Sequence, residues 1–231
     1  MEKVGIIGGI GPESTIEYYR LIINGFRERL STDQYPEVLI YSINMTEMLD
    51  LVFKDELDAL VELLKRKINV LEVSQVDYVA LASNTPHLVF DRLAKSVSVP
   101  LISIVEETCK YVLEAGVRTV GLLGTKSTMI KGFYQEVGEK YGLEIYTPNE
   151  EDQAYVHEKY MGELVFKQII PETKSQLIQI VKKLETQKNI EGIILGGTEL
   201  PLILQQGDFD TLKVFDTTRI HVHAILDKMI S

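Results

Sequence analysis

The feature that most limits the possible folds is an internal repeat with a period of about half the chain. Asp77–His87 and Glu191–Pro201 each hold an apolar run, small residues and a threonine before a proline or histidine, and a shift of 114 positions superimposes them. A second pair, Val4–Gly9 and Val120–Thr125, matches with a shift of 116 positions. Two pairs at nearly the same spacing indicate a duplication, although any two strands that end in glycine look similar.

Short apolar runs alternate with amphipathic stretches along the whole chain. The apolar runs predict buried parallel strands, and the 3.6-residue periodicity predicts helices. Strands are expected at 4–7, 38–44, 76–82, 99–104, 118–123, 143–146, 190–195 and 213–215, and helices at 14–30, 55–74, 88–95, 105–115, 154–169, 172–188, 200–206 and 217–230. This alternation predicts an α/β fold of two pseudo-symmetric Rossmann-like half-domains with parallel sheets and a site in the cleft between them.

The repeat also predicts where the half-domains divide. We expect residues 1–98 together with 210–231 to form the first, and residues 99–209 to form the second. The last strand and helix are assigned to the first half because their counterpart, near 99–115, lies at the other junction. We also expect Thr128 to cap the helix that follows it.

Composition excludes several classes of function. The 231 residues carry a net charge of −10, which argues against general binding to nucleic acids or anionic membranes. No apolar run reaches the roughly 18 residues that a membrane-spanning helix needs. The chain starts with a strand pattern instead of a signal sequence, so we expect a cytoplasmic protein. The single cysteine, Cys109, cannot form an internal disulfide and is expected to be a buried hydrophobic residue.

Parallel α/β sheets bind ligands beyond the carboxyl ends of their strands. The residues expected there are glycines, hydroxyls, amides and a few ionisable groups: Gly8, Gly9, Ser83, Asn84, Thr85, His87, Thr125, Ser127, Thr128, Gly197, Thr198 and Glu199. Such groups suit a small anionic ligand with carboxylates. No cluster of His, Cys, Asp and Glu has the spacing of metal ligands, so the sequence predicts no metal.

Each of these residues also has a purely structural interpretation. Asn84, Thr85 and Thr198 can cap a helix or satisfy a turn. His87 can bond a neighbouring loop, and Glu199 can simply complement a helix amino terminus. Lys167, in the motif from Tyr160 to Lys167, is either a partner for a substrate carboxylate or a solvated lysine.

Taken together, the motifs resemble the aspartate/glutamate racemase family. The resemblance covers essentially the whole chain and rests on five motifs in order: Gly8-Gly9 with Pro12-Glu-Ser14-Thr15, Ser83-Asn84-Thr85-Pro86-His87, Gly124-Thr125, Gly197-Thr198-Glu199 and Phe215-Asp216-Thr217. It implies two pseudo-symmetric α/β domains, a small amino-acid substrate, no cofactor and a homodimer.

The resemblance also implies two catalytic cysteines, one per domain, which act on opposite faces of the substrate Cα. Their positions correspond to Ser83 and Gly197 in this chain. A serine hydroxyl is far less acidic than a thiol and needs a neighbouring base, and glycine offers no side chain. Thiol chemistry is therefore expected to be absent or impaired, with Glu199 as the candidate replacement on the second face. The expected substrate-binding residues are Gly8, Gly9, Asn84, Thr85, Thr125, Thr198 and Lys167.

These observations lead to one main hypothesis about function and two alternatives. The main hypothesis is an aspartate/glutamate racemase-like protein that acts on, or binds, a small amino dicarboxylic acid without a cofactor. The first alternative is a non-catalytic protein that binds amino acids or dicarboxylates. The second is another reaction on the same scaffold with Ser83 as nucleophile, for which His87, one turn further on, is the available base.

Overall fold

The computed structural model describes residues 2–31 and 33–231, so Met1 and Thr32 of the expected first half-domain lie outside the described part. The strands are β1 (Val4–Gly8), β2 (Val38–Ser42), β3 (Tyr78–Leu81), β4 (Leu101–Ile102), β5 (Thr119–Gly124), β6 (Glu144–Tyr146), β7 (Gly192–Gly196) and β8 (Lys213–Asp216). They form two four-stranded sheets in which all described pairings are parallel, as the sequence predicts.

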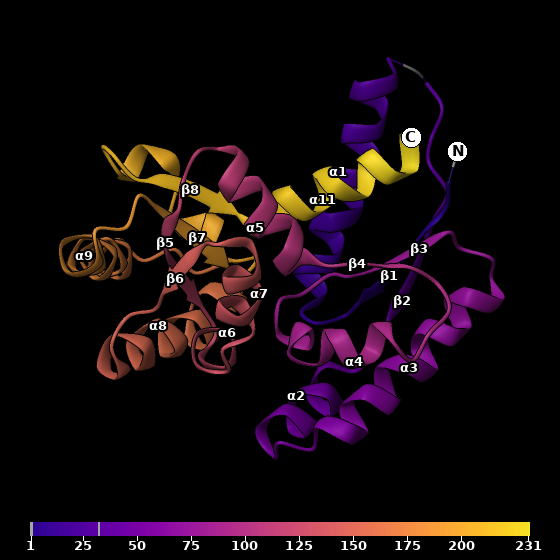
Figure 1. Cartoon of the computed structure of the whole chain (residues 1–231), viewed down its shortest axis with the longest axis horizontal. Coiled ribbons are helices and arrows are strands. Elements are labelled where there is room, and N and C mark those ends of the chain that lie inside the picture. Colours follow the sequence, from indigo (N-terminus) through magenta and orange to yellow (C-terminus); the bar gives the residue numbers. More distant parts are fainter. Residues whose placement is uncertain (1, 32) are drawn as a thin grey trace. The chain divides into compact units, whose positions relative to one another are not determined.

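Helices connect the strands (Figure 1). The α-helices are α1 (Pro12–Leu30), α2 (Met45–Phe53), α3 (Leu57–Val73), α4 (Phe90–Ala94), α5 (Ile104–Glu114), α6 (Lys126–Ile130), α7 (Phe133–Tyr141), α8 (Glu150–Gly162), α9 (Pro171–Lys188), α10 (Leu200–Ile203) and α11 (Thr217–Ile230). Short 3-10 helices are η1 (Thr85–Val89), η2 (Leu164–Phe166) and η3 (Gln206–Asp208). Across the residues that the structure describes, none of the helices is long and apolar enough to span a membrane.

The first compact unit comprises the residues up to Ile104 and the segment His221–Ser231. Its strand order is β2-β1-β3-β4. One face of the sheet packs on α3 through residues such as Leu64 and Ile68. The other face packs on α1 and on α11, which lie side by side in Figure 1. Because both faces are covered, the central strand β1 is buried along its whole length, which explains its continuous apolar run.

The second compact unit, Val105–Ile220, repeats this plan with the strand order β6-β5-β7-β8. Helices α8 and α9 supply Val156, Leu177 and Val181 to a core that also contains Ile193 of β7. The two central strands of this sheet, β5 and β7, pair in register from Val120 with Gly192 to Gly124 with Gly196.

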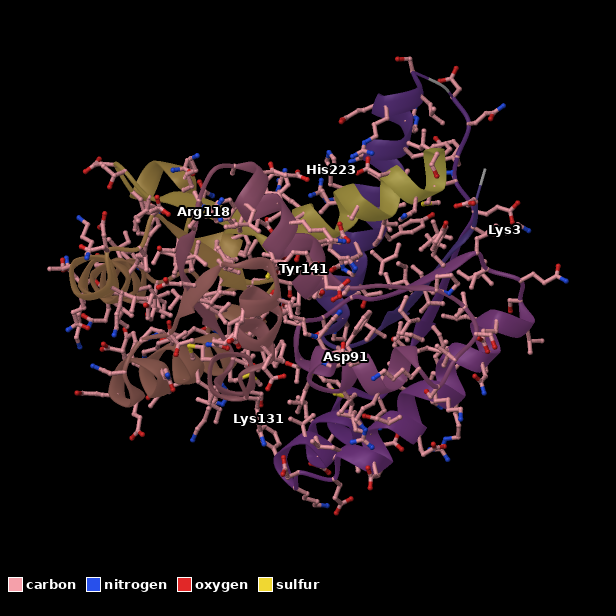
Figure 2. The ribbon with its side chains drawn as sticks, in the orientation of Figure 1. Lys3, Asp91, Arg118, Lys131, Tyr141 and His223 are labelled. Atoms are coloured by element: carbon pink, nitrogen blue, oxygen red, sulfur yellow. The ribbon has the colours of Figure 1, made fainter. Side chains whose placement is uncertain are left out.

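The amino ends of the central strands are fixed in the same way in both units. The Asp77 carboxylate accepts a hydrogen bond from the Lys3 amide (2.6 Å), and the Glu191 carboxylate accepts from the Arg118 and Thr119 amides (2.7 and 3.1 Å). Figure 2 labels Lys3 and Arg118 at these strand starts. Backbone donors at the start of a strand are thus satisfied by an acidic residue that precedes the neighbouring strand. Asp77 and Glu191 are separated by the same 114 positions as the sequence repeat.

The unit boundaries differ from those that the repeat predicts. Residues 99–104 stay with the first unit because β4 pairs with β3, with Val79 opposite Leu101. Residues 210–220 stay with the second unit because β8 pairs with β7, with Ile194 opposite Phe215. Only the part of α11 from His221 onward returns to the first unit. Strand pairing, which the periodicity of a short strand does not reveal, sets both boundaries.

Two local expectations also change. The cap of α6 is Thr125, whose hydroxyl oxygen accepts from the Thr128 amide (3.4 Å), and Thr128 itself lies inside the helix. The predicted helix 154–169 begins earlier, because Asn149 caps its first turn by accepting from the Asp152 amide (2.9 Å), and it ends at Gly162.

Candidate functional site

In the first unit, the loop after β1 is closed by a threonine. The Thr15 hydroxyl oxygen accepts a hydrogen bond from the Gly9 amide (2.8 Å). A Cβ atom on Gly8 would lie 2.4 Å from the Thr15 side chain, so only glycine fits there, and Gly9 has a left-handed φ of +84°. The Gly9 amide is therefore already paired, and a substrate carboxylate could use it only by displacing Thr15.

Ser14 joins this loop to the next strand end. Its hydroxyl donates to the Ala82 carbonyl (2.9 Å) in buried surroundings. The start of α1 and the end of β3 are thereby held together, which is possible because β1 and β3 are neighbours in the sheet. The predicted residues Gly8, Gly9 and Ser83 consequently lie together at the carboxyl ends of the neighbouring strands β1 and β3.

The segment that begins at Ser83 is held by His87. The Nε2 atom of His87 accepts a hydrogen bond from the Ile104 amide (3.2 Å), so the ring proton must be on Nδ1, which donates to the Ser83 carbonyl (3.0 Å). The ring also stacks on Phe90, with centroids 5.0 Å apart. We call this arrangement of His87 with Ser83 and Ile104 the histidine latch.

His221 packs beside the latch and is also neutral. Its Nε2 donates to the Ile102 carbonyl (3.0 Å), so its Nδ1 accepts from the Tyr18 hydroxyl (2.8 Å). Burial lowers the pKa of His87 to about 3, with a further contribution from His221. Burial likewise lowers the pKa of His221 to about 4. Both nitrogens of His87 are committed to the backbone, so His87 cannot take a proton from the Ser83 hydroxyl while the latch is closed.

Ser83 itself is half-buried, whereas Asn84 and Thr85 are buried (3% and 6% exposed). Within the part of the chain that the structure describes, the Ser83 hydroxyl makes no hydrogen bond. It is therefore available to a ligand, but no described side chain acts on it as a base.

In the second unit, the end of β5 carries the predicted residue Thr125, which caps α6. Its hydroxyl lies 3.1 Å from that of Thr128. Thr128 is fully buried and packs so closely on the strand ends that a Cβ on Gly124 would lie 2.9 Å from it. Thr125 is half-buried. Ser127 lies in the first turn of α6, the helix that Thr125 caps.

The end of the neighbouring strand β7 is occupied by a tyrosine from α8. A Cβ atom on Gly197 would lie 2.4 Å from Cε2 of Tyr160 and 2.8 Å from its hydroxyl oxygen. The Tyr160 hydroxyl donates to Oε2 of Glu199, which also accepts from the Thr198 hydroxyl (2.7 Å). Tyr160 and Glu199 are each 7% exposed. Position 197 thus lacks a side chain of its own, and the Tyr160 ring fills the space.

Tyr160 is the site residue that sequence reasoning missed. Burial raises the pKa of its phenol well above the usual value, and the neighbouring Glu199 carboxylate adds to this rise. It precedes Gly197 by 37 positions and belongs to the motif that had been considered only for Lys167. The available signal was the glycine itself, since the resemblance implies a functional side chain at that position, and close packing requires another side chain to fill the volume that a glycine leaves.

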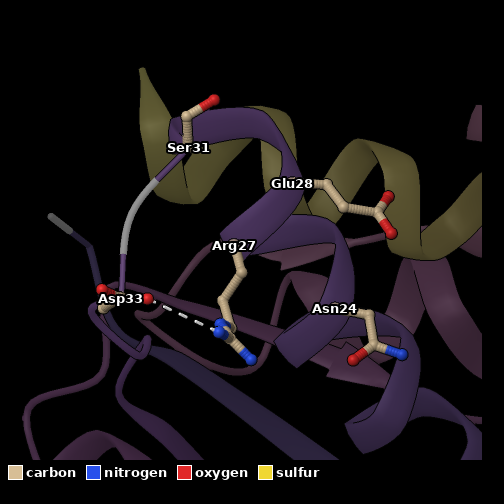
Figure 3. A pocket seen from close by; sticks show the side chains of 5 residues that line it. All are labelled: Asn24, Arg27, Glu28, Ser31 and Asp33. Carbon is tan, nitrogen blue, oxygen red and sulfur yellow. Dashed lines mark ion pairs between the residues drawn. The ribbon is translucent and has the colours of Figure 1, made fainter.

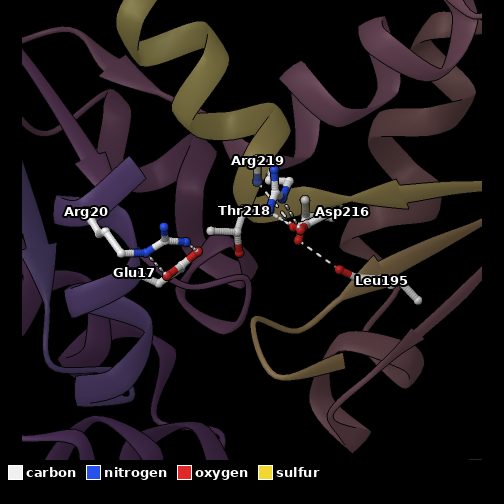
Figure 4. A network of polar contacts seen from close by, with 7 residues as sticks. Glu17, Arg20, Leu195, Asp216, Thr218 and Arg219 are labelled. Carbon is white, nitrogen blue, oxygen red and sulfur yellow. Dashed lines mark hydrogen bonds and ion pairs between the residues drawn. The ribbon is translucent and has the colours of Figure 1, made fainter. Parts of the chain in front are cut away.

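Two further predicted positions have ordinary structural surroundings. Lys167 is exposed and ends η2 with a left-handed φ of 58°. Asp216 begins α11 by accepting from the Thr218 and Arg219 amides (2.9 and 3.2 Å), as Figure 4 shows. Thr217 donates its hydroxyl to the Leu195 carbonyl (2.9 Å) and so fixes the end of β7.

The predicted residues therefore form two groups, each on neighbouring central strands of one sheet. Those of the first unit are Gly8, Gly9, Ser83, Asn84, Thr85 and His87, and those of the second are Thr125, Ser127, Thr128, Gly197, Thr198 and Glu199. Among residues 2–31 and 33–231, no three His, Cys, Asp or Glu side chains gather as a metal site would require.

The first unit also has a surface hollow that is separate from its group of predicted residues. It is lined by Asn24, Arg27, Glu28, Ser31 and Asp33, at the carboxyl end of α1 (Figure 3). Arg27 and Asp33 are 3.7 Å apart, and all five residues are exposed. The predicted loop, by contrast, precedes the amino end of the same 19-residue helix. The hollow is an open polar depression and contains none of the predicted residues.

Comparisons with known proteins agree with the fold and the motifs. The family model for Asp/Glu/Hydantoin racemase matches residues 7–225. The broad specificity amino-acid racemase RacX of Bacillus subtilis (strain 168) is 30% identical over 157 residues, which cover 65% of this chain and 66% of that protein. The chain thus spans slightly less than two thirds of that relative.

Two solved structures are similar over the full length of both chains. A candidate Asp/Glu racemase from Yersinia pestis superimposes with a TM-score of 0.93 at 32% identity. An aspartate racemase homologue from Pyrococcus horikoshii OT3 superimposes with a TM-score of 0.88 at 38% identity. With the family model covering nearly all residues, the chain belongs to the Asp/Glu/hydantoin racemase family.

Proposed function

We propose that this protein is an aspartate/glutamate racemase-like protein that binds a small amino dicarboxylic acid and exchanges its Cα proton without a cofactor. The observation that carries the proposal is the family match over residues 7–225, in a chain whose strand ends bear hydroxyls and amides suited to carboxylates. Asn84, Thr85, Thr125 and Thr198 are the proposed carboxylate-binding residues, with the loop at Gly8 and Gly9. Lys167 remains a proposed partner for a carboxylate.

The proposed chemistry does not use the family's thiols. Ser83 and Gly197 stand at the two positions, and Cys109 is fully buried, with a pKa that burial raises to about 12. A thiol held in its protonated form in an apolar core is inert. The reaction is therefore expected to be slow relative to a two-thiol enzyme, with Ser83 and the group around Glu199 as the candidate proton-transfer positions.

A second candidate function is supported by a specific observation. The histidine latch leaves Ser83 without a base, because both ring nitrogens of His87 bond to the backbone. This arrangement favours a protein that binds amino acids or dicarboxylates without reacting with them. It also weighs against hydrolysis or decarboxylation with Ser83 as the nucleophile.

Proton NMR in deuterated buffer, combined with chiral separation, distinguishes these functions. Racemisation replaces the Cα proton of L-aspartate or L-glutamate by deuterium and produces the D-isomer. Binding alone leaves the Cα proton in place and raises the melting temperature of the protein, by an amount that grows with the logarithm of the ligand concentration divided by Kd. Since RacX is described as having broad specificity, the panel should include the other chiral amino acids. No exchange and no melting shift with any of them would contradict the proposal.

Restoring the thiols provides a second test. The double variant Ser83→Cys with Gly197→Cys is prepared with Cys109→Ala, so that all reactivity comes from the new thiols, and with Tyr160→Leu, so that the side chain at 197 has room. It is expected to gain racemisation if only the thiols are missing. Cys109→Ala alone removes the one cysteine of the chain, so racemisation at rates normal for the family in this variant would contradict the expectation that the reaction is slow without thiols.

We also propose, from the family resemblance, that the protein is a homodimer that acts in the cytoplasm. Light scattering on the purified protein would test the dimer, and fractionation of the source cells would test the location. A monomer at micromolar concentration would contradict the first of these proposals.

A further inference from the structure

Position 197 is the starting point for a more specific assignment. The family places a proton-transfer side chain there, and this chain has glycine. The closest atoms to a Cβ built on Gly197 all belong to Tyr160, including the hydroxyl oxygen at 2.8 Å. These separations are shorter than a real Cβ tolerates, so a side chain at 197 and the Tyr160 ring compete for the same volume.

The surroundings of the Tyr160 hydroxyl suit proton transfer. Its proton points at Oε2 of Glu199, and the Thr198 hydroxyl donates to the same oxygen at 2.7 Å. The Glu199 carboxylate therefore lies within hydrogen-bond reach of the phenol proton, which is the geometry that a proton acceptor requires. Glu199 begins the short helix α10 and is 7% exposed, so the pair is largely shielded from water.

We propose that Tyr160 replaces the side chain of residue 197 as the proton-transfer residue of the second unit, with Glu199 as its proton acceptor. The proposal rests on the proposed function and names the residue that would perform it. When the substrate is deprotonated, the phenol oxygen takes the Cα proton while the phenol proton moves to Oε2 of Glu199. The Cα–H and phenol O–H bonds break, new O–H bonds form at both oxygens, and the negative charge passes from Glu199 to the substrate. Reprotonation by Tyr160 runs the same two transfers in reverse and returns a proton to the same face of the substrate, so inversion needs one of the two transfers to occur at the Ser83 face.

The first experiment tests the chemistry. Cα deuterium exchange on L- and D-aspartate, glutamate and the wider amino-acid panel is measured for the wild type, Tyr160→Phe, Glu199→Gln and Tyr134→Phe. Tyr134 is the matched control, because it is a fully buried tyrosine of the same unit whose hydroxyl bonds to Thr108. We expect Tyr160→Phe and Glu199→Gln to lower the exchange rate about 100-fold or more, and Tyr134→Phe to stay within about twofold of the wild type.

Exchange by Tyr160→Phe within about twofold of the wild-type rate would overturn the proposal while leaving the proposed function standing. A wild type that exchanges no amino acid in the panel would overturn both the proposed racemase chemistry and the role of Tyr160 in it. The proposal would also be overturned if the variants lost exchange only to the extent that they lost thermal stability. A hydroxyl with a purely structural role would give that result. Melting temperatures of all four proteins are therefore measured alongside.

The second experiment tests the shared volume and needs no activity. Gly197→Ala is made in the wild type, in Tyr160→Phe and in Tyr160→Leu. The nearest contact is a ring carbon, so the substitution should lower the melting temperature by about 4 °C or more in the first two backgrounds. It should lower it by less than about 2 °C in Tyr160→Leu, where the ring is gone.

A matched control is Gly162→Ala, because nothing lies within 4 Å of a Cβ at Gly162. It should leave the melting temperature within about 2 °C of the wild type. An equal effect of Gly197→Ala in all three backgrounds would show that Tyr160 does not occupy the position, and would overturn the proposal whatever the activity measurements give. If Gly197→Ala is tolerated only in Tyr160→Leu and the wild type is inactive, Tyr160 occupies the position but both the racemase chemistry and its role in that chemistry are overturned.

Discussion

The ends of β3 and β7 are counterparts in the repeat, yet each is held by a different kind of contact. In the first unit, His87 reaches back from its own segment and bonds to backbone atoms of Ser83 and Ile104. In the second unit, the position equivalent to His87 is Pro201, which has no such groups, and Tyr160 arrives from a separate helix to bond Glu199.

This difference shows that the two copies diverged in how they use the strand end while the scaffold stayed the same. Both sheets keep one strand order, and both central strands are fixed by an acidic residue at their amino ends. The first unit leaves the hydroxyl of Ser83 open, whereas the second fills the volume at Gly197 with a neighbouring ring. Each unit therefore depends on a different residue at this strand end, His87 in the first and Tyr160 in the second.

The largest expected effect comes from opening the histidine latch. Replacing His87 with alanine leaves the Ser83 carbonyl and the Ile104 amide without the imidazole and creates a cavity beside Phe90. We expect the free energy of unfolding to fall by about 4 kcal/mol. Urea denaturation measures it, with His223→Ala as the control because His223 is exposed. A loss below about 1 kcal/mol would show that the latch does not hold the segment.

Acid should weaken the first unit through the same residues. Folded His87 and His221 have pKa values of about 3 and about 4, whereas an unfolded histidine binds a proton near pH 6.5. Between these values the unfolded state binds more protons, so stability falls as the pH falls. From pH 6.5 to pH 5 we expect a loss of about 3 kcal/mol from the two histidines together.

Urea denaturation at several pH values tests this expectation, and the window stops at pH 5 because carboxylates begin to titrate below it. A free energy of unfolding that is constant over this range would contradict the assignment of both rings as neutral and buried.

Removing the hydroxyl that closes the first loop should have an intermediate effect. Thr15→Val keeps the shape of the side chain but leaves the Gly9 amide without its acceptor. We expect a loss of about 1–2 kcal/mol in the free energy of unfolding. The variant also frees the Gly9 amide, so tighter binding of a dicarboxylate would indicate that the loop is part of the ligand site. Thr128→Val in the second unit removes only a hydroxyl that lies 3.1 Å from the Thr125 hydroxyl, so it leaves no backbone amide without an acceptor.

The smallest expected effects test the symmetry of the strand starts. Asp77→Asn and Glu191→Gln each weaken a carboxylate contact to backbone amides at a central strand. The amide bonds from Arg118 and Thr119 lower the pKa of Glu191, but the group is exposed. We expect losses of roughly 0.5–1 kcal/mol from each, and similar to one another. If only one of the two variants lost stability, the carboxylates of Asp77 and Glu191 would not have equivalent roles at the starts of the central strands.

The sequence predicted the order of elements and the parallel sheets, because buried strands read as apolar runs and helices as periodic ones. It did not predict which sheet receives β8. Lys213–Asp216 has the same local pattern in either sheet, and only its pairing with β7 places it in the second. Local periodicity specifies an element but not its neighbour.

The candidate site divides in the same way. Residues that follow directly after strands, such as Ser83 and Thr125, could be placed at the carboxyl ends of those strands from the sequence alone. Tyr160 could not, because its contact with Gly197 depends on how α8 packs against the sheet. The commitment of both His87 nitrogens was equally hidden, since one of its partners is the amide of Ile104, 17 positions away.

The division of the chain has a consequence for how the protein is made. The first unit contains the beginning of the chain and its last residues, His221–Ser231, with the whole of the second unit inserted between them. The core that contains Ile22 and Phe26 of α1 is completed only when α11 arrives with Ile225. During synthesis the second unit can therefore be completed first, while the earlier-made segment waits with part of its apolar core uncovered. A chain that ends prematurely near Ile220 would keep that part of the core open and be prone to aggregate.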